Sequence, residues 1–368
     1  MQAQVEGLLS RRLTPTRPGT HHPVSPSHGP MLQPMPTHER EITAPVDLCT
    51  PQGRLNPEAV GWSRTPLHHC AMPGWGRRKK WEYWCITTPT HLIALTIADI
   101  DYLGLTSVYL LEYGQQEITR TALRPLAHGV RLPDSLATGP SAALGPIRAL
   151  IHDTDKATRL HFSCHTPQGR LFADLTVDLP QDHQSMNVVI PWSADRFQYT
   201  SKHTARPARG TVRLGDRTLD FTDAWGVLDH GRGRWPYDTR WNWGAASGRT
   251  DGHTVGLQFG GQWTKGTGLT ENALCVDGHL TKIGEELHWD YDPHDPHRPW
   301  RIRTPHSDRV DVVFTPFHER VDRTNAAVIV NDTHQLFGHY TGTIRPDQGD
   351  ALDVDGLLGF AEHVHMRW

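Results

Sequence analysis

The stretch DAWGVLDHGRGRWPYDTRWNWGAASG, from Asp223 to Gly248, is the part of the chain around which the fold is organised. It holds four of the 13 tryptophans, interleaved with aspartates, arginines and glycines. This mixture is too polar for a core strand and too aromatic for a disordered loop, because an indole ring adds a large apolar area and keeps a polar N–H group. We therefore predict that the stretch forms the wall of a pocket.

The titratable side chains of this stretch have two interpretations. In the first, an aspartic acid buried against indole rings has a raised pKa and donates a proton to an alkene or a carbonyl group. The candidate catalytic residues, which share the ability to exchange a proton, are Asp229, His230, Tyr237 and Asp238. In the second, Arg232 or Arg234 pairs with one of the aspartates and locks the local structure.

Other side chains of the same stretch are candidates for contact with a ligand. Trp241 and Trp243 are two residues apart, so on a strand both indole rings lie on one face. The predicted ligand-binding residues of the stretch are Arg232, Trp235, Trp241, Asn242 and Trp243.

The composition of the chain excludes several classes of protein. A formal net charge of −3 over 368 residues gives no steering toward nucleic acid. No apolar run approaches the roughly 18–20 residues that span a bilayer, so stable membrane insertion is not expected. The five cysteines are odd in number and widely spread, which is typical of reduced, buried thiols. Since the N-terminus lacks a signal-peptide pattern, we expect a cytoplasmic protein.

Apolar alternation and turn residues predict an all-β fold. Residues 1–41 are rich in Pro, His, Ser and Thr and are expected to be a disordered tail. Strands are then predicted in pairs, for example Thr211–Leu214 and Thr218–Phe221 across a Gly-Asp turn. We expect two tandem β-barrel or sandwich domains, at 42–209 and 210–368, with the second carrying the Trp/Arg-rich motif.

Several sequence blocks follow one another in an order that resembles the DUF2804 family, whose members are uncharacterised bacterial proteins. The blocks are DLC (47–49), LNP (55–57), VGWSR (60–64), KKWEYW (79–84), DHGRGRWPY (229–237), WNW (241–243), TENAL (270–274), FGHYTGT (337–343) and GLLGFAEHVHMRW (356–368). The resemblance covers the chain from Ile42 to Trp368.

A second resemblance concerns an aspartate that is followed, about a dozen residues on, by Trp-x-Trp. Asp229-His230 and Trp241-Asn242-Trp243 are similar to the motif of the carotenoid hydratase, tocopherol cyclase and AttH-like superfamily. This resemblance implies two tandem calycin-like (lipocalin-type) barrels, and some members act on isoprenoid or other hydrophobic substrates. The arginine-rich insertion HGRGRWPYDTR departs from the hydratase pattern.

Three further residues outside the stretch are candidates for ligand binding. Glu271 supplies a second carboxyl group, and Asn272 is placed to orient a polar group of a ligand. The alternative is that both satisfy backbone groups at a strand end. His339 lies in a predicted strand, where a hydrogen-bonded structural histidine is the alternative to a ligand contact.

The histidines near the C-terminus raise the question of a metal site. His363 and His365 share one side of a predicted strand, but no third ligand accompanies them, and we predict no metal site. The sequence also has no GxGxxG after a strand, no P-loop and no GxSxG, so we expect no cofactor.

Together these observations predict a protein that binds a small hydrophobic molecule, lipid- or isoprenoid-like, in a Trp-lined pocket. If the protein is an enzyme, the predicted chemistry is acid-catalysed hydration or cyclisation. The alternative is a non-catalytic β-barrel protein whose Asp/Arg/Trp motif is a structural clamp between domains.

Overall fold

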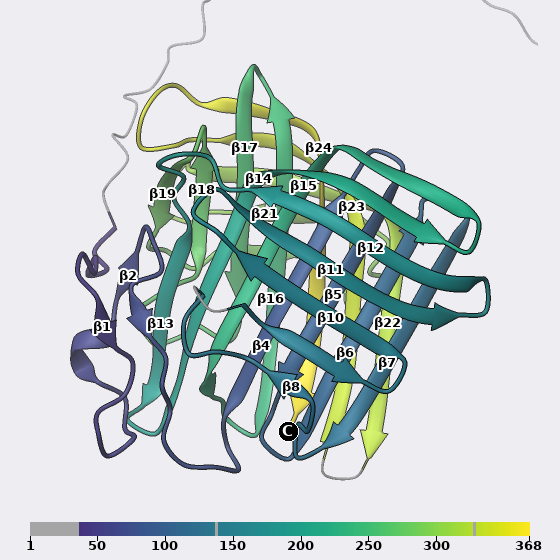
Figure 1. Cartoon of the computed structure of the whole chain (residues 1–368). Helices are drawn as coiled ribbons and strands as arrows, with labels where there is room; N and C mark the ends of the chain where they lie inside the picture. The colour runs from purple at the N-terminus through teal and green to yellow at the C-terminus, as the bar shows by residue number, and fades with distance from the viewer. Residues whose placement is uncertain (1–36, 137–138, 327–328) are drawn as a thin grey trace, which may run out of the picture. The chain divides into compact units, whose positions relative to one another are not determined.

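The computed structural model describes residues 37–136, 139–326 and 329–368 (Figure 1). Most of these residues lie in antiparallel strands, with one short 3-10 helix at Pro57–Ala59. The predicted all-β class is therefore confirmed, and the chain forms two curled half-barrel sheets. Within the described residues, no helix is long and apolar enough to span a membrane. Residues 1–36 of the predicted tail lie outside the described residues.

The first sheet has 13 strands in the order β7-β6-β5-β4-β15-β14-β12-β11-β10-β9-β8, with β13 pairing with β14 and β2 pairing with β13. The strands are β2 (Trp62–Ser63), β4 (Lys79–Thr87), β5 (His91–Asp99), β6 (Leu103–Glu112), β7 (Gln116–Pro125), β8 (Val130–Arg131), β9 (Ser141–Leu144), β10 (Ile147–Asp153), β11 (Ala157–Thr166), β12 (Gly169–Asp178), β13 (Met186–Ser193), β14 (Arg196–Leu214) and β15 (Arg217–Arg234).

The second sheet has nine strands in the order β19-β18-β17-β16-β24-β23-β22-β21-β20. The strands are β16 (Asp238–Thr250), β17 (His253–Gly261), β18 (Asn272–Val276), β19 (His279–Ile283), β20 (His288–Asp290), β21 (Trp300–Arg303), β22 (Val310–Ala326), β23 (Ile329–Ile344) and β24 (Leu352–Arg367). A separate parallel pair joins β1 (Val46–Asp47) and β3 (His68–His69).

The predicted hairpins are present where glycine supplies the turn. β14 and β15 pair from Leu214 with Arg217, and Gly215 between them has φ +58°, a conformation that glycine adopts without steric strain. The chain crosses from the first sheet to the second between Arg234 and Asp238. The division into domains after residue 209 stays a prediction.

Each sheet encloses its own apolar core. In Figure 1, β10–β12 cross β5–β7, and residues from both sets, such as Ile97 and Leu160, belong to one buried cluster. The first sheet therefore curls over itself. A second cluster, which includes Phe314 and Leu336, fills the curl of the second sheet. All five cysteines lie in the described part of the chain, and each is buried and unpaired.

A third layer of side chains lies between the two sheets. On β4, Trp84 and Ile86 enter the first core, whereas Tyr83 and Cys85 point to the opposite face. That face packs against residues of β16, β23 and β24, including Phe360. Because successive side chains of a strand alternate, one run of residues serves both the core and the space between the sheets.

Candidate functional site

A cavity of about 260 Å³ lies between the two sheets. Its lining comes from β4, β5, β6, β14 and β15 of the first sheet, from β16, β22, β23 and β24 of the second, and from segments between strands. Six tryptophans supply much of its surface: Trp81, Trp235, Trp241, Trp243, Trp263 and Trp368. We call this cavity the Trp pocket.

Strand alternation selects which residues enter the Trp pocket. Trp241 and Trp243 both line it, because they are two residues apart on β16. On β14 the same spacing places Gln198, Thr200 and Lys202 in the lining. The cavity is thus built from alternate residues of strands whose other face is packed.

Three buried carboxyl groups line the Trp pocket, and each accepts a hydrogen bond from a tryptophan, whereas a fourth lining carboxyl group, that of Asp322, is exposed. Nε1 of Trp81 donates to Oδ2 of Asp229 at 2.9 Å. Nε1 of Trp263 donates to Oε1 of Glu271 at 2.7 Å. Nε1 of Trp241 donates to Oε1 of Glu362 at 2.8 Å, and Nε2 of Gln335 donates to its Oε2 at 3.3 Å. The indole groups therefore hold the carboxyl groups in place as well as lining the cavity.

Lys202 is the buried cation of this group. Its Nζ atom lies 3.0 Å from Oδ1 of Asp229 and 3.5 Å from Oε2 of Glu271. The ammonium group also lies 3.9 Å from the ring centroid of Trp243. Burial alone lowers the pKa of Lys202, but Asp229, Glu271 and Glu362 outweigh burial, so the pKa is raised. Lys202 is therefore an ammonium ion at neutral pH.

The two glutamates are set for proton exchange near neutral pH. Burial raises the pKa of Glu271 to about 7, although the Lys202 ammonium opposes the change. Burial also raises the pKa of Glu362 to about 7, against the hydrogen bond from Trp241 and the charge of Lys202. Loss of hydration disfavours the ionised form, and the nearby Asp229 carboxylate acts in the same direction.

Glu271 has an oxygen that is open to a ligand. The residue is 1% exposed, and its Oε2 atom has no hydrogen-bond partner among the described residues. A buried polar atom without a partner is unusual in native proteins and points to a function or to a bound molecule. Oε2 still has an ion-pair contact, with the Lys202 ammonium group at 3.5 Å. Because Oε1 accepts from Trp263, the proton of an un-ionised Glu271 belongs on Oε2.

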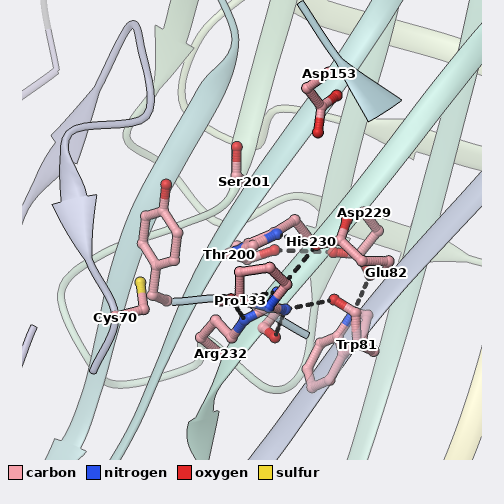
Figure 2. A network of polar contacts seen from close by, with 12 residues as sticks. Cys70, Trp81, Glu82, Pro133, Asp153, Thr200, Ser201, Asp229, His230 and Arg232 are labelled. Atoms are coloured by element: carbon pink, nitrogen blue, oxygen red, sulfur yellow. Dashed lines mark hydrogen bonds and ion pairs between the residues drawn. The ribbon is translucent and has the colours of Figure 1, made fainter. Parts of the chain in front are cut away.

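His230 and Arg232 lie on the other face of β15 (Figure 2). Nδ1 of His230 lies 2.5 Å from Oε1 of Glu82, and Nη2 of Arg232 donates to the same oxygen at 3.0 Å. The guanidinium also donates to backbone carbonyls, including that of Pro133 at 3.0 Å. The expected pairing of Arg232 with Asp229 or Asp238 is wrong, because Arg232 meets Glu82 instead.

The charge of Arg232 determines the protonation of this second cluster. Burial raises the pKa of Glu82, but contacts with His230 and Arg232 outweigh it, so the pKa is lowered. Burial and the charge of Arg232 lower the pKa of His230. An ionised Glu82 therefore pairs with Arg232 beside a neutral His230, which is a structural arrangement rather than an acid–base pair.

The remaining predicted residues lie in different places. Trp235 lines the Trp pocket, whereas Tyr237 is 44% exposed. Asp238 pairs at the surface with Nε2 of His365 at 2.9 Å. Since β15 ends at Arg234 and β16 begins at Asp238, Tyr237 and Asp238 belong to the exposed crossing between the sheets.

Asn242, Asn272 and His339 do not line the Trp pocket. The Asn242 amide donates to the hydroxyl group of Tyr291 at 3.0 Å. Asn272 accepts from the backbone N–H of Gly260 at 2.7 Å, so it satisfies a backbone group as the alternative interpretation expected. His339 is exposed, with its ring 5.4 Å from that of Phe317.

The histidines of β24 are each engaged by protein groups. Nδ1 of His363 lies 2.7 Å from the hydroxyl oxygen of Tyr291, and His365 pairs with Asp238. Within the described ranges, no group of three or more His, Cys, Asp or Glu side chains is placed to hold a metal ion.

Sequence reasoning missed several residues of the site. Lys202 comes from β14, far from the Trp-rich stretch, and a single lysine in a strand gives no local signal. Glu362 directly precedes His363, and a single glutamate in a strand gives no local signal either. Trp81 carried a signal, because KKWEYW alternates aromatic and charged residues, as a strand with two packed faces does.

Two glycines make room for the site. A Cβ atom on Gly231 would lie 2.1 Å from the indole ring of Trp81, and one on Gly260 would lie 2.2 Å from Cγ of Glu271. Any side chain at these positions would displace the group that forms the pocket wall.

Comparisons with known proteins place the chain in a family. A family model described as a domain of unknown function (DUF2804) matches residues 39–368. No curated protein sequence matches the chain. An AttH-like protein from Nitrosomonas europaea is similar over 78% of this chain and 92% of its own, with 12% identity and a TM-score of 0.46. Kievitone hydratase from Nectria haematococca covers 80% of this chain and 89% of its own, with 9% identity and a TM-score of 0.44.

Proposed function

The chain belongs to the DUF2804 family, and we propose that its Trp pocket binds a hydrophobic, lipid- or isoprenoid-like small molecule and transfers a proton to it. The observation that carries this proposal is the Oε2 atom of Glu271. It is buried, it has no hydrogen-bond partner among the described residues, and it belongs to a carboxyl group whose pKa is raised to about 7. A general acid works best when its pKa lies near the working pH.

The reaction that this geometry supports is hydration or cyclisation of an alkene. Glu271 donates its proton to one carbon, and the π electrons form the new C–H bond. The second carbon becomes a cation, which the faces of the surrounding indole rings stabilise. Water, or a hydroxyl group of the same molecule, then attacks the cation, and its proton returns to the Glu271 carboxylate. The step needs no oxidant or reductant.

In this proposal Asp229 and Lys202 support the acid. Both oxygens of Asp229 are engaged, one by Trp81 and the other by Thr200 and Lys202. Lys202 faces the carboxylate that Glu271 becomes after proton transfer and stabilises its charge. Asp229 is therefore assigned to holding the ammonium group.

The test measures whether a deuteron from the solvent is incorporated at a carbon atom of a product. The full chain is incubated in D₂O with an apolar extract of the cells that make it, and the extract is compared by mass spectrometry before and after. We expect a compound that gains deuterium at carbon, either with the addition of water or with no other change in composition. Glu271→Gln should abolish the conversion, and Glu58→Gln, at an exposed surface position, should retain it.

An extract that remains unchanged with the native protein would contradict the catalytic part of the proposal. Native mass spectrometry of the purified protein tests the binding part, since a retained apolar compound is expected. A protein that carries none and also takes up none from the extract would contradict the binding part as well.

A structural clamp is the second candidate, and one contact favours it. Lys202 and Asp229 belong to the first sheet, whereas Glu271 lies directly before β18 of the second. The Lys202–Glu271 contact thus joins the two sheets. If this joint is the whole function, Glu271→Gln lowers stability at every pH, and the pH test in the Discussion distinguishes the two.

A further inference from the structure

The charges inside the Trp pocket do not balance. Among the described residues that line its buried part, three carry carboxyl groups and one carries an ammonium group. Lys202 contacts Asp229 at 3.0 Å and Glu271 at 3.5 Å. Glu362 accepts hydrogen bonds only from neutral donors, Trp241 and Gln335. Buried charges are normally paired, but no cation among the described residues contacts Glu362 directly, and the charges of Lys202 and Arg320 lower its pKa only from a distance.

The charged groups around Glu362 come from several elements. Lys202 of β14 and Asp229 of β15 largely cancel each other. From β22, Arg320 reaches the lining with its guanidinium 4.4 Å from the ring centroid of Tyr109, and the exposed Asp322 carries the opposite charge. The hydroxyl group of Tyr83 accepts from Gln335 at 3.1 Å.

Beyond Glu271, the described residues carry no excess of positive charge, because Lys282 faces the carboxyl groups of both Glu39 and Glu286. Glu39 and Lys282 form a buried ion pair there, and the backbone N–H of Thr270 donates to Glu39 at 2.8 Å. The charged groups beyond Glu271 therefore do not compensate the excess negative charge of the Trp pocket, which lies at Glu362.

We propose that the ligand of the Trp pocket carries a positively charged centre, an amine or quaternary ammonium group, that pairs with Glu362 and packs against the indole rings. This inference rests on the proposed function, because it names the class of molecule that the same site takes. Lys202 illustrates the chemistry, since its ammonium group lies on the face of Trp243, the residue that pairs with Glu362 across β16 and β24.

The two glutamates then have separate roles. Glu362 has a hydrogen bond to each oxygen, which suits a carboxylate facing a cation. Glu271 keeps an oxygen free to donate a proton. Without a ligand, burial raises the pKa of Glu362 to about 7, so this carboxyl group carries a proton in much of the protein near neutral pH. The proton neutralises the carboxylate with which a cationic ligand pairs. Binding of a cation displaces this proton, and affinity therefore increases as pH rises through 7.

The test uses a pair of probes of the same shape, phenyltrimethylammonium and its neutral isostere tert-butylbenzene. Binding to the full chain is followed by tryptophan fluorescence and calorimetry at pH 6 and pH 8. At pH 8 we expect the cation to bind about tenfold more tightly than the neutral probe, the gain given by one cation–π contact in a desolvated pocket plus an ion pair. Calorimetry in two buffers of different ionisation enthalpy should show proton release with the cation.

Matched variants test whether Glu362 causes the preference for the cation. Glu362→Gln should reduce the preference for the cation at pH 8 to the part given by the cation–π contact and remove its dependence on pH, whereas Glu58→Gln should change neither. If Glu362→Gln does not fold, the pH dependence of the unmodified chain still decides, because a preference equal at pH 6 and pH 8 contradicts the proposal.

The two probes distinguish a failure of the cationic-ligand proposal from a failure of the proposed function. Equal affinity for the two probes at pH 8 would overturn the cationic ligand and leave the hydrophobic pocket of the proposed function intact. If neither probe binds, the cationic ligand is overturned together with the proposed function.

Discussion

Oε2 of Glu271 lies 3.5 Å from the ammonium nitrogen of Lys202 and receives no hydrogen bond from any described residue. The glutamate lies directly before β18 of the second sheet, and the lysine lies on β14 of the first. This ion pair stabilises the carboxylate form of Glu271, and in the proposed reaction Oε2 is the oxygen that exchanges a proton with a molecule in the cavity.

The raised pKa values of Glu271 and Glu362 predict a falling stability from acid to neutral pH. Between about pH 4.5 and 7 the native state holds protons that the unfolded chain has released, so stability decreases as pH rises. A change from 4.5 to about 7 corresponds to about 3 kcal/mol per group. Glu271→Gln should therefore be more stable than the native chain at pH 8 and equal to it at pH 5. Urea unfolding at both values measures this.

An exposed glutamate provides the control, and Glu58→Gln should leave the pH dependence of stability unchanged. A Glu271→Gln variant that is less stable at pH 8 would support the structural clamp in place of the acid.

Removal of the Lys202 charge should destabilise the fold. Lys202→Met leaves Asp229 buried without a counter-ion, which costs roughly 3–5 kcal/mol at neutral pH. It also removes the charge that lowers the pKa of Glu271 and Glu362, so both pKa values should rise further. Urea unfolding at pH 7 measures the first effect, with exposed Lys265→Met as the control. Equal stability of the two variants would show that Asp229 is not held by Lys202.

Gly231 should resist substitution because of Trp81. In Gly231→Ala the new Cβ atom meets the indole ring at 2.1 Å, so the ring must move and its hydrogen bond to Asp229 is lost. The expected loss is roughly 1–3 kcal/mol, as for other overpacked sites. Thermal unfolding of Gly231→Ala alone and with Trp81→Leu tests this cause. If the clash with Trp81 is responsible, Gly231→Ala should be nearly neutral in the Trp81→Leu background.

The second cluster should affect stability without affecting the Trp pocket. Arg232→Met leaves an ionised Glu82 buried, and we expect a loss of roughly 3–5 kcal/mol at pH 8. At lower pH the loss should be smaller, because His230 can then take up a proton and pair with Glu82. Urea unfolding measures stability, tert-butylbenzene fluorescence titration measures the pocket, and exposed Arg249→Met is the control. A large change in probe affinity would show that the two faces of β15 are coupled.

The fold class was predictable because it depends on local patterns. Runs such as His91–Asp99 are β-branched and apolar, and turns such as Gly215-Asp216 mark where a strand reverses. The order of the strands in each sheet and the curling of each sheet depend on contacts between distant segments, such as Ile97 with the core of β11. A single sequence does not state those contacts.

The site was predictable only in part, for a physical reason. Composition pointed to Trp235, Trp241 and Trp243, and all three line the cavity, while their contact with a ligand stays a prediction. Composition alone indicated one polar cluster, because the stretch is too polar for a strand buried in a core. In the structure Asp229 and His230 are neighbours on β15 and point to opposite faces. Lys202 is brought to Asp229 by sheet pairing across β14 and β15, which no local pattern reveals.

The alternation along β15 has a consequence for how such a chain can change by insertion and deletion. Deleting or adding a single residue in the half of the strand before Asp229 exchanges the two sets of side chains. The carboxylate would then point into the closed interior, and His230 and Arg232 would enter the cavity. Point substitutions can alter one set at a time, whereas a one-residue length change alters both. Homologues are therefore expected to keep the length of 217–234 constant and to vary in length at surface turns.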